Sequence, residues 1–261
     1  MIPLLVFDIE TVPDTQGLRR LHGLDASLSD LDVAEFAYAR RRIQSGHDFL
    51  PPHLQRVVAI SCALREGQSF RVWSLGGADE DEAVLIQRFY DGLERYTPQL
   101  VSWNGSGFDL PVLHYRSMIH GLNASRYWDM GEDDRDFRYN NYISRYHTRH
   151  LDLMDLLALY NGRNFVPLDE MAQLIGLPGK LGMDGSKVWP AFASGDIHSI
   201  RNYCETDVVN TYLVYLRFQL MRGQINKDRH ATECALVRES LERYDALHWK
   251  EFLAAWQGTG A

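Results

Sequence analysis

The sequence predicts an α/β protein built on one central sheet. Short apolar runs with strand character come early and are interleaved with longer segments of helical spacing, which is typical of this class. The chain has 261 residues, 45% of them hydrophobic, which is enough for a sizeable core. It contains no internal repeat and no low-complexity segment.

The first 120 residues supply four strands. The apolar run Leu4–Phe7 predicts a buried first strand that leads into Asp8, Ile9 and Glu10. A more polar stretch, residues 14–52, follows; it is helical in pattern and ends at paired prolines, so we interpret it as an insertion. The other elements predicted here are strands over residues 57–64, 69–75 and 100–103, a helix over 79–96, and a helix from about Asp109.

The remainder is mostly helical. A polar, aromatic stretch after Gly121 predicts a long loop to about Arg149. The later segments are an apolar pattern over residues 150–160, a short helix over 168–175, a glycine-rich loop over 176–185, a long helix over 197–221 and a helical tail over 230–256. We expect one domain over residues 1–261, with the insertion at about 14–52 and a C-terminal helical extension at about 222–261.

Charge and composition limit the partners. The net charge of −8 argues against tight, sequence-independent binding of a duplex, because phosphate binding normally rests on Lys and Arg. No apolar run reaches the roughly 18 residues of a membrane span, and the N-terminus does not read as a signal peptide. Cys62, Cys204 and Cys234 lie far apart and form no paired framework, so we expect a reducing, cytoplasmic setting.

Asp8 and Glu10 are the first candidates for chemistry. They are two residues apart on a predicted strand, so their side chains point to the same face. Burying two unpaired carboxylates together is costly, and a divalent cation between them would remove that cost. The alternative is that both are simply exposed at the end of the strand.

Three further residues have a structural and a functional interpretation. Asp109 precedes Leu110 and Pro111, a pattern that also suits a helix N-cap. Tyr203 and Asp207 are four residues apart on a predicted helix and so share a face, which an ordinary polar helix surface also explains. As a set, the four carboxylates offer oxygen-only ligands that suit Mg²⁺ or Mn²⁺. Such a set can hold two ions roughly 4 Å apart for phosphoryl transfer.

Three segments resemble, in order, the three motifs of the DEDD superfamily of 3′-5′ exonucleases. They are Phe7-Asp-Ile-Glu-Thr11, Trp103-Asn-Gly-Ser-Gly-Phe-Asp-Leu-Pro111 and Tyr203-Cys-Glu-Thr-Asp207. One branch of the superfamily has a histidine five residues before the last aspartate. Here Asn202 occupies that position, so the chain is similar to the tyrosine branch, and in particular to the proofreading domain of family B DNA polymerases and to predicted PolB-like exonucleases. The resemblance covers roughly Ile2 to Leu216.

The resemblance implies an RNase H-like fold, with a mixed central sheet flanked by helices, and two divalent cations, Mg²⁺ or Mn²⁺. Carried over by position, it implies that Tyr203 places the attacking water. It implies metal ligation by four carboxylates, Asp8, Glu10, Asp109 and Asp207, and contacts to the terminal nucleotide from Thr11, Asn104 and Phe108. Phe108 has an alternative interpretation as a core contact under its helix.

The expected activity is removal of nucleotides from the 3′ end of single-stranded nucleic acid, with DNA favoured over RNA. Two alternatives stay open: a binding or scaffolding module of the same fold without chemistry, and a phosphodiesterase for short oligonucleotides. In the glycine-rich loop, Lys180 or Lys187 could contact substrate phosphate. Elsewhere, His147 and His150 raise the alternative of a zinc site, and Asp152 or Asp155 could support the active site or cap a helix.

Overall fold

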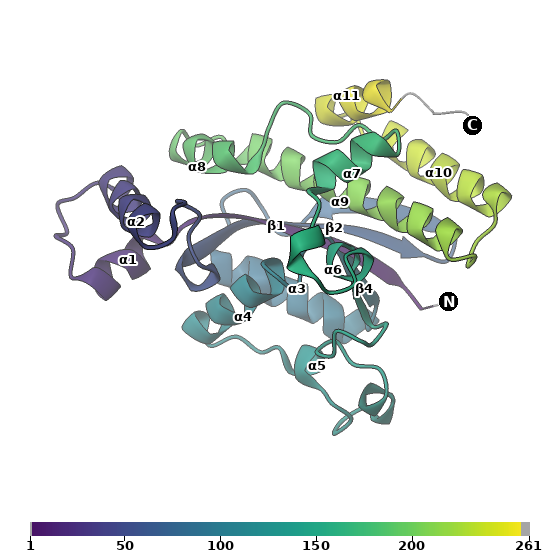
Figure 1. Ribbon diagram of the computed structural model, residues 1–261, viewed down its shortest axis with the longest axis horizontal. Helices are drawn as coiled ribbons and strands as arrows, with labels where there is room; N and C mark the ends of the chain where they lie inside the picture. The colour runs from purple at the N-terminus through teal and green to yellow at the C-terminus, as the bar shows by residue number, and fades with distance from the viewer. Residues whose placement is uncertain (1, 257–261) are drawn as a thin grey trace.

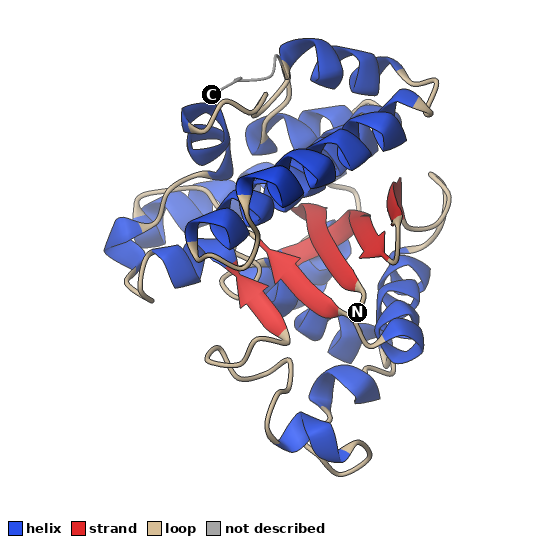
Figure 2. Ribbon diagram, turned by 90° about the vertical axis from the view of Figure 1, so that its right-hand side faces the viewer, coloured by secondary structure: helices blue, strands red, loops and turns tan. Residues whose placement is uncertain are grey.

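The computed structural model describes residues 2–256 and contains a five-stranded sheet with helices on both faces (Figures 1 and 2). The strand order is β3-β2-β1-β4-β5. Strand β2 is antiparallel to β1 and β3, whereas β4 and β5 run parallel to β1. The strands are β1 (Leu4–Pro13), β2 (Gln55–Glu66), β3 (Ser69–Ser74), β4 (Gln99–Ser102) and β5 (His150–Asp152). The α/β prediction is confirmed, as is the mixed central sheet flanked by helices that the resemblance implied.

Two helical layers cover the sheet. Helices α3 (Glu82–Tyr96) and α4 (Asp109–His120) cover one face (Figure 1). The long helix α9 (Ile197–Met221) lies across the other face. Around α9 lie α7 (Leu168–Leu174), α8 (Gly185–Ala193), α10 (Lys227–Glu242) and α11 (Leu247–Ala255). None of the helices in the described part of the chain is long and apolar enough to cross a membrane.

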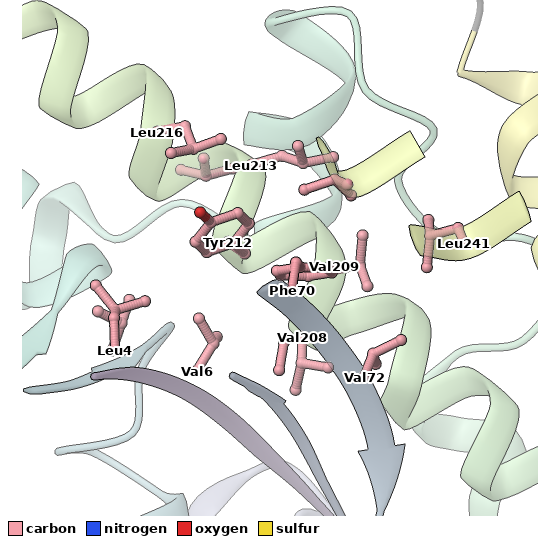
Figure 3. Packing of buried hydrophobic residues seen from close by; sticks show 14 of the residues in the cluster. Leu4, Val6, Phe70, Val72, Val208, Val209, Tyr212, Leu213, Leu216 and Leu241 are labelled. Carbon is pink, nitrogen blue, oxygen red and sulfur yellow. The ribbon is translucent and has the colours of Figure 1, made fainter. Parts of the chain in front are cut away.

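The alternation of side chains along β1 separates two cores. Leu4 and Val6 belong to the core under α9, together with Val208 and Tyr212 of that helix (Figure 3). The intervening residues Leu5, Phe7 and Ile9 belong to the core under α3 and α4. Because the strand has a period of two, the face of Leu4 and Val6 continues through Asp8 and Glu10.

Several elements differ from the prediction. Residues 150–160, predicted only as apolar, form the short strand β5 followed by α6 (Leu153–Leu157). Helix α8 follows directly on the glycine-rich loop, where no helix was predicted, and Asp184 caps it by accepting from the Ser186 N–H. The tail is helical as predicted and contains two helices, α10 and α11. The predicted 14–52 segment folds as α1 (Thr15–His22) and α2 (Asp30–Ser45), beyond one end of the sheet (Figure 1).

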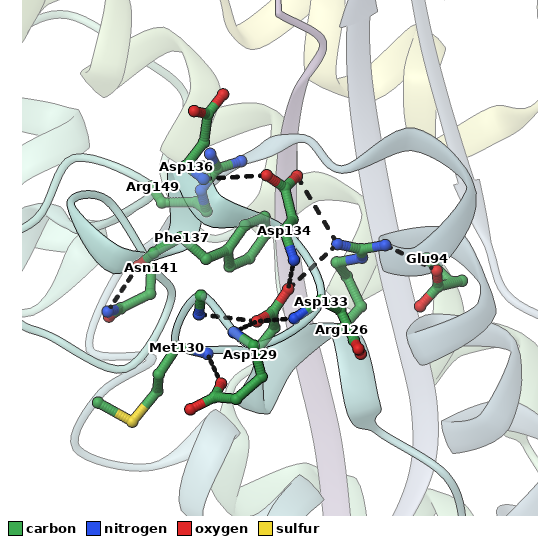
Figure 4. Close-up of polar contacts among 12 residues, drawn as sticks. Glu94, Arg126, Asp129, Met130, Asp133, Asp134, Asp136, Phe137, Asn141 and Arg149 are labelled. Carbon is green, nitrogen blue, oxygen red and sulfur yellow. Dashed lines mark hydrogen bonds and ion pairs between the residues drawn. The ribbon is translucent and has the colours of Figure 1, made fainter.

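In the predicted loop between Gly121 and Arg149, one carboxylate binds several backbone N–H groups. The loop contains only α5 (Ser125–Trp128) and a short 3₁₀ turn, Arg135–Arg138. The buried carboxylate of Asp129 accepts four backbone N–H groups, from Gly131, Glu132, Asp133 and Asp134 (Figure 4). Although burial opposes it, these donors lower the pKa of Asp129 below its ordinary value.

Candidate active site

Asp8 and Glu10 lie side by side on the face of β1 that α9 covers. Glu10 is buried and Asp8 is half-buried. Between them, Ile9 points into the opposite core. The two carboxylates therefore share one face as predicted, and the alternative of an exposed strand end is wrong.

Asp109 reaches the same strand from the first turn of α4. Its Oδ1 accepts the backbone N–H of Ile9 at 3.1 Å, across 100 positions of sequence. Phe108, not Asp109, is the N-cap residue of α4, and no side-chain capping bond is present there. The N-cap interpretation is therefore wrong. The buried carboxylate instead ties the start of α4 to the backbone between Asp8 and Glu10.

Tyr203 and Asp207 come from α9, opposite β1. Both are buried, each with 7% of its surface exposed, so the alternative of an ordinary polar helix surface is wrong. Burial raises the pKa of Tyr203, and the neighbouring carboxylates of Asp207, Glu10 and Asp8 raise it further. Asp207 Oδ1 is buried and has no hydrogen-bond partner among residues 2–256.

Burial makes these carboxylates difficult to ionise. Burial raises the pKa of both Asp8 and Glu10 well above their ordinary values. The charges of Asp109 and Asp207 add to this for both residues, and that of Glu10 adds to it for Asp8. Burial raises the pKa of Asp207 to about 6 and that of Asp109 to about 7. Positive charge placed among these oxygens would reverse the shifts. The donor set and the unpartnered Asp207 oxygen therefore fit a divalent cation.

The tightest group of potential ligand atoms includes a residue that the sequence analysis missed. Ligand atoms of Asp8, Glu10 and Cys204 all lie within 4.8 Å of one another, and Asp109 and Asp207 do not belong to this group. The Cys204 Sγ–H donates to Asp8 O at 3.4 Å and to Asp8 Oδ2 at 3.5 Å. Burial raises the pKa of the Cys204 thiol, and Asp8 and Glu10 add to this, so the thiol serves as a hydrogen-bond donor. The sequence feature that could have identified Cys204 is its position three residues before Asp207, which places both on the same helix face.

An open cleft of about 760 Å³ lies over this cluster. Three of the predicted substrate contacts line it: Thr11, Asn104 and Phe108. The Thr11 hydroxyl already donates to Gln55 Oε1 at 3.1 Å. The half-buried ring of Phe108 also packs against the core under α3 and α4, which confirms its alternative interpretation as a core contact.

Asp152 holds the turn that carries Asn104. Its two carboxylate oxygens accept the backbone N–H groups of Asn104, at 2.9 Å, and Ser106, at 2.8 Å. Asn104 has a left-handed backbone, with φ of 67°, which asparagine tolerates better than most residues. Asp152 also caps α6, which confirms the predicted capping role. Asp155 lies further out, paired with Arg145 at 2.6 Å.

Of the two lysines considered, Lys180 lies at the cluster. Its Nζ is 5.5 Å from the centre of the Tyr203 ring, and its charge lowers the pKa of Glu10 and Asp207 against the effect of burial. The loop that carries it is fixed by Asn210, which donates to Gly179 O at 3.0 Å, and by Asp169, which accepts the Lys180 N–H at 2.7 Å. Lys187 instead donates to Gly182 O at 2.7 Å.

The structure gives no support to a zinc site at His147 and His150. His147 Nδ1 accepts the Asn141 N–H at 3.0 Å, and His150 Nε2 lies 2.8 Å from the Ser102 hydroxyl. Neither residue belongs to a group of potential metal ligands within residues 2–256.

Comparison with known proteins supports the family resemblance. A family model described as a predicted 3′-5′ exonuclease related to the exonuclease domain of PolB matches residues 47–256. The catalytic chain of DNA polymerase epsilon from Saccharomyces cerevisiae is 26% identical over 145 residues, which are 54% of this chain and 6% of the polymerase. A DNA polymerase from Archaeoglobus fulgidus is 22% identical over 150 residues, 56% of this chain and 19% of that protein.

A solved family B DNA polymerase from Pyrobaculum calidifontis is also similar, with a TM-score of 0.48 and 19% identity. The match covers 85% of this chain and 25% of the polymerase. In each of these comparisons the matched part is a small fraction of the larger protein. Because the family model matches most of its length, the chain belongs to the family of predicted 3′-5′ exonucleases related to the exonuclease domain of PolB.

Proposed function

We propose that this chain is a metal-dependent 3′-5′ exonuclease that acts on single-stranded nucleic acid, with DNA favoured over RNA. The observation that carries the proposal is the convergence of four carboxylates from β1, α4 and α9 beneath one open cleft. We further propose that residues 1–261 act as a single exonuclease domain. Residues of about 14–52 would be an insertion in it, and those of about 222–261 a C-terminal extension.

Asp8, Glu10, Asp109 and Asp207 would hold two divalent cations, Mg²⁺ or Mn²⁺. When bound, such ions lower the pKa of water and stabilise the leaving oxygen of a phosphodiester. Support comes from the raised pKa values of all four carboxyl groups and from the unpartnered oxygen of Asp207.

The chain's own residues would orient the substrate and the water. The raised pKa of Tyr203 keeps its hydroxyl protonated, so it would position the attacking water by hydrogen bonding and would not act as a base. Lys180 brings a positive charge to the same place and would face a phosphate. Thr11, Asn104 and Phe108 would contact the terminal nucleotide from the walls of the cleft.

An unpaired 3′ end is the substrate that suits this site best. The net charge of −8 disfavours a long electrostatic interface with a duplex. Binding only the last nucleotides of one strand requires few positively charged side chains. We therefore expect faster cleavage of single-stranded or frayed 3′ ends than of blunt duplex ends. Equal rates on the two at physiological salt would contradict this preference.

The test is nucleotide release from single-stranded DNA and RNA with Mg²⁺ or Mn²⁺. The control is the double variant Asp8→Asn/Asp207→Asn, which lacks two of the proposed ligands. Release of mononucleotides by the parent and not by the variant is the expected result. Binding without release would instead identify a binding module, and cleavage confined to dinucleotides would identify a phosphodiesterase for short oligonucleotides.

A further inference from the structure

The insertion between β1 and β2 forms one wall of the cleft. Helices α1 and α2 have a small core of their own, made by Leu18, Val33, Ala37 and Leu50. Leu50 is only 2% exposed, whereas the preceding residue, Phe49, is 57% exposed and lines the cleft beside Asp8 and Glu10. A large apolar ring therefore stands in solvent next to the carboxylates.

The backbone at Phe49 is fixed on both sides. Arg41 of α2 donates from Nε to Phe49 O at 3.0 Å. Gln55 donates from Nε2 to Leu50 O at 3.0 Å, and its Oε1 accepts the Thr11 hydroxyl at 3.1 Å. Thr11 is adjacent to Glu10, so this chain of contacts sets the position of Phe49 relative to the carboxylates.

Phe49 meets the ring of Phe108, which comes from the start of α4. The two ring centres are 5.2 Å apart and the planes are tilted by 50°. Both rings line the same cleft. An aromatic wall of this kind suits a nucleobase, since every base has a face that can stack.

Charge decides which part of a nucleotide would face this wall. Asp48, next to Phe49, also lines the cleft, and its carboxylate would repel a phosphate. The positive charge near the site, on Lys180, lies instead at Tyr203 of α9. With cations held by the carboxylates of β1 and α9, as proposed above, a nucleotide would place its base against the insertion and its phosphate towards α9 and β1.

We propose that Phe49 is a substrate-binding residue that, together with Phe108, stacks on the unpaired base of the 3′-terminal nucleotide. The inference rests on the proposed function and goes beyond it, because it gives the insertion a role: the insertion carries a base-binding residue to the cleft. A base must leave its duplex partner to reach this wall, so the wall also favours single-stranded ends.

The test compares Phe49→Ala with Phe49→Trp and with a matched control, Phe36→Ala. Phe36 is an exposed phenylalanine on α2 that contacts His22 and is not among the residues that line the cleft. Stacking on one base is worth about 1–3 kcal/mol, so Phe49→Ala should raise KM for single-stranded DNA by about 5- to 160-fold with little change in kcat. Phe49→Trp and Phe36→Ala should match the parent.

A substrate with a 3′-terminal abasic residue separates stacking from a structural effect. With no base to stack on, the parent and Phe49→Ala should have the same KM. If Phe49→Ala raised KM equally on the intact and abasic substrates, or raised it on neither, the proposal would be overturned. Melting curves should show little change for Phe49→Ala, because the side chain is mostly exposed.

Binding provides a readout that does not depend on turnover. 2-Aminopurine placed at the 3′ end of a single strand should be quenched by the parent and by Phe36→Ala, and much less by Phe49→Ala. Quenching by a parent that releases no nucleotides would contradict the proposed function and support the stacking role. Nucleotide release by the parent, with equal quenching by the parent and Phe49→Ala, would support the proposed function and contradict the stacking role.

Discussion

Replacing Asp109 with asparagine isolates the cost of burying one ionised carboxylate beside the cleft. An asparagine keeps the size of the side chain and an oxygen that can accept the Ile9 N–H, but it carries no charge. Burial raises the pKa of Asp109 from 3.8 to about 7. At about 1.4 kcal/mol per pKa unit, this shift corresponds to about 4 kcal/mol of destabilisation when the group is ionised.

We therefore expect Asp109→Asn to be more stable than the parent in EDTA at pH 8.5, by about 2–4 kcal/mol. The lower end allows for the weaker hydrogen bond that a neutral oxygen makes to Ile9. For a chain of this size each kcal/mol shifts Tm by roughly 2–4 °C, so the expected increase is roughly 4–16 °C.

The advantage should depend on pH. The folded-state pKa of Asp109 is raised, so its contribution to stability is complete below its unfolded pKa of about 4 and is lost as pH rises through about 7. The Tm difference between variant and parent should therefore be largest at pH 8.5 and shrink towards pH 5.5. Mg²⁺ should raise the Tm of the parent and have little effect on the variant, because a ligand stabilises only the state that binds it.

Asp129→Asn is the matched control, because it makes the same substitution at another buried aspartate. The Asp129 carboxylate accepts four backbone N–H groups and has a lowered pKa despite its burial (Figure 4). An amide cannot replace both acceptor oxygens, so this variant should melt below the parent. The reasoning is refuted if Asp109→Asn also melts lower in EDTA at pH 8.5.

Three further predictions concern the site and the fold. Tyr203→Phe should lower kcat by about 10²-fold, because it removes only an orienting hydroxyl; a metal titration should show unchanged affinity, and a loss as deep as that of Asp8→Asn would contradict this role. Ca²⁺ should support release poorly in place of Mg²⁺, because its looser coordination positions water and phosphate less well; full activity after exhaustive EDTA treatment would exclude a metal. Arg116→Met should cost about 3–5 kcal/mol in urea titrations, because Asp14 and Glu82, both paired with Arg116, would stay buried without it; a change below about 1 kcal/mol would show that the ion pairs contribute little.

The sequence predicts best those features that depend on local periodicity. The shared face of Asp8 and Glu10 follows from the period of a strand, and that of Tyr203 and Asp207 from the period of a helix. The long helix α9 was also predicted with its full bounds, 197–221. Each of these conclusions needs only neighbouring residues, so tertiary contacts did not alter it.

The errors arise where contacts distant in sequence decide the outcome. Asp109 has the pattern of an N-cap, yet its partner is Ile9, 100 positions away. Strand β5 has three residues, too few to show a period, and exists because it pairs with β4. Phe49 gave no signal in the sequence, because its place beside Phe108 depends on how the insertion folds back onto the cleft. The roles of the site residues in catalysis stay predictions.

The most direct test of the central claim follows the fate of the two ends of one strand. Single-stranded DNA labelled at its 3′ end or at its 5′ end is incubated with the protein and Mg²⁺ or Mn²⁺, beside Asp8→Asn/Asp207→Asn. The account predicts that the 3′ label leaves at once as a mononucleotide, while the 5′ label passes through a ladder of progressively shorter strands, and that the variant leaves both substrates intact. Early release of the 5′ label, internal fragments before any mononucleotide, or equal cleavage by the variant would contradict it.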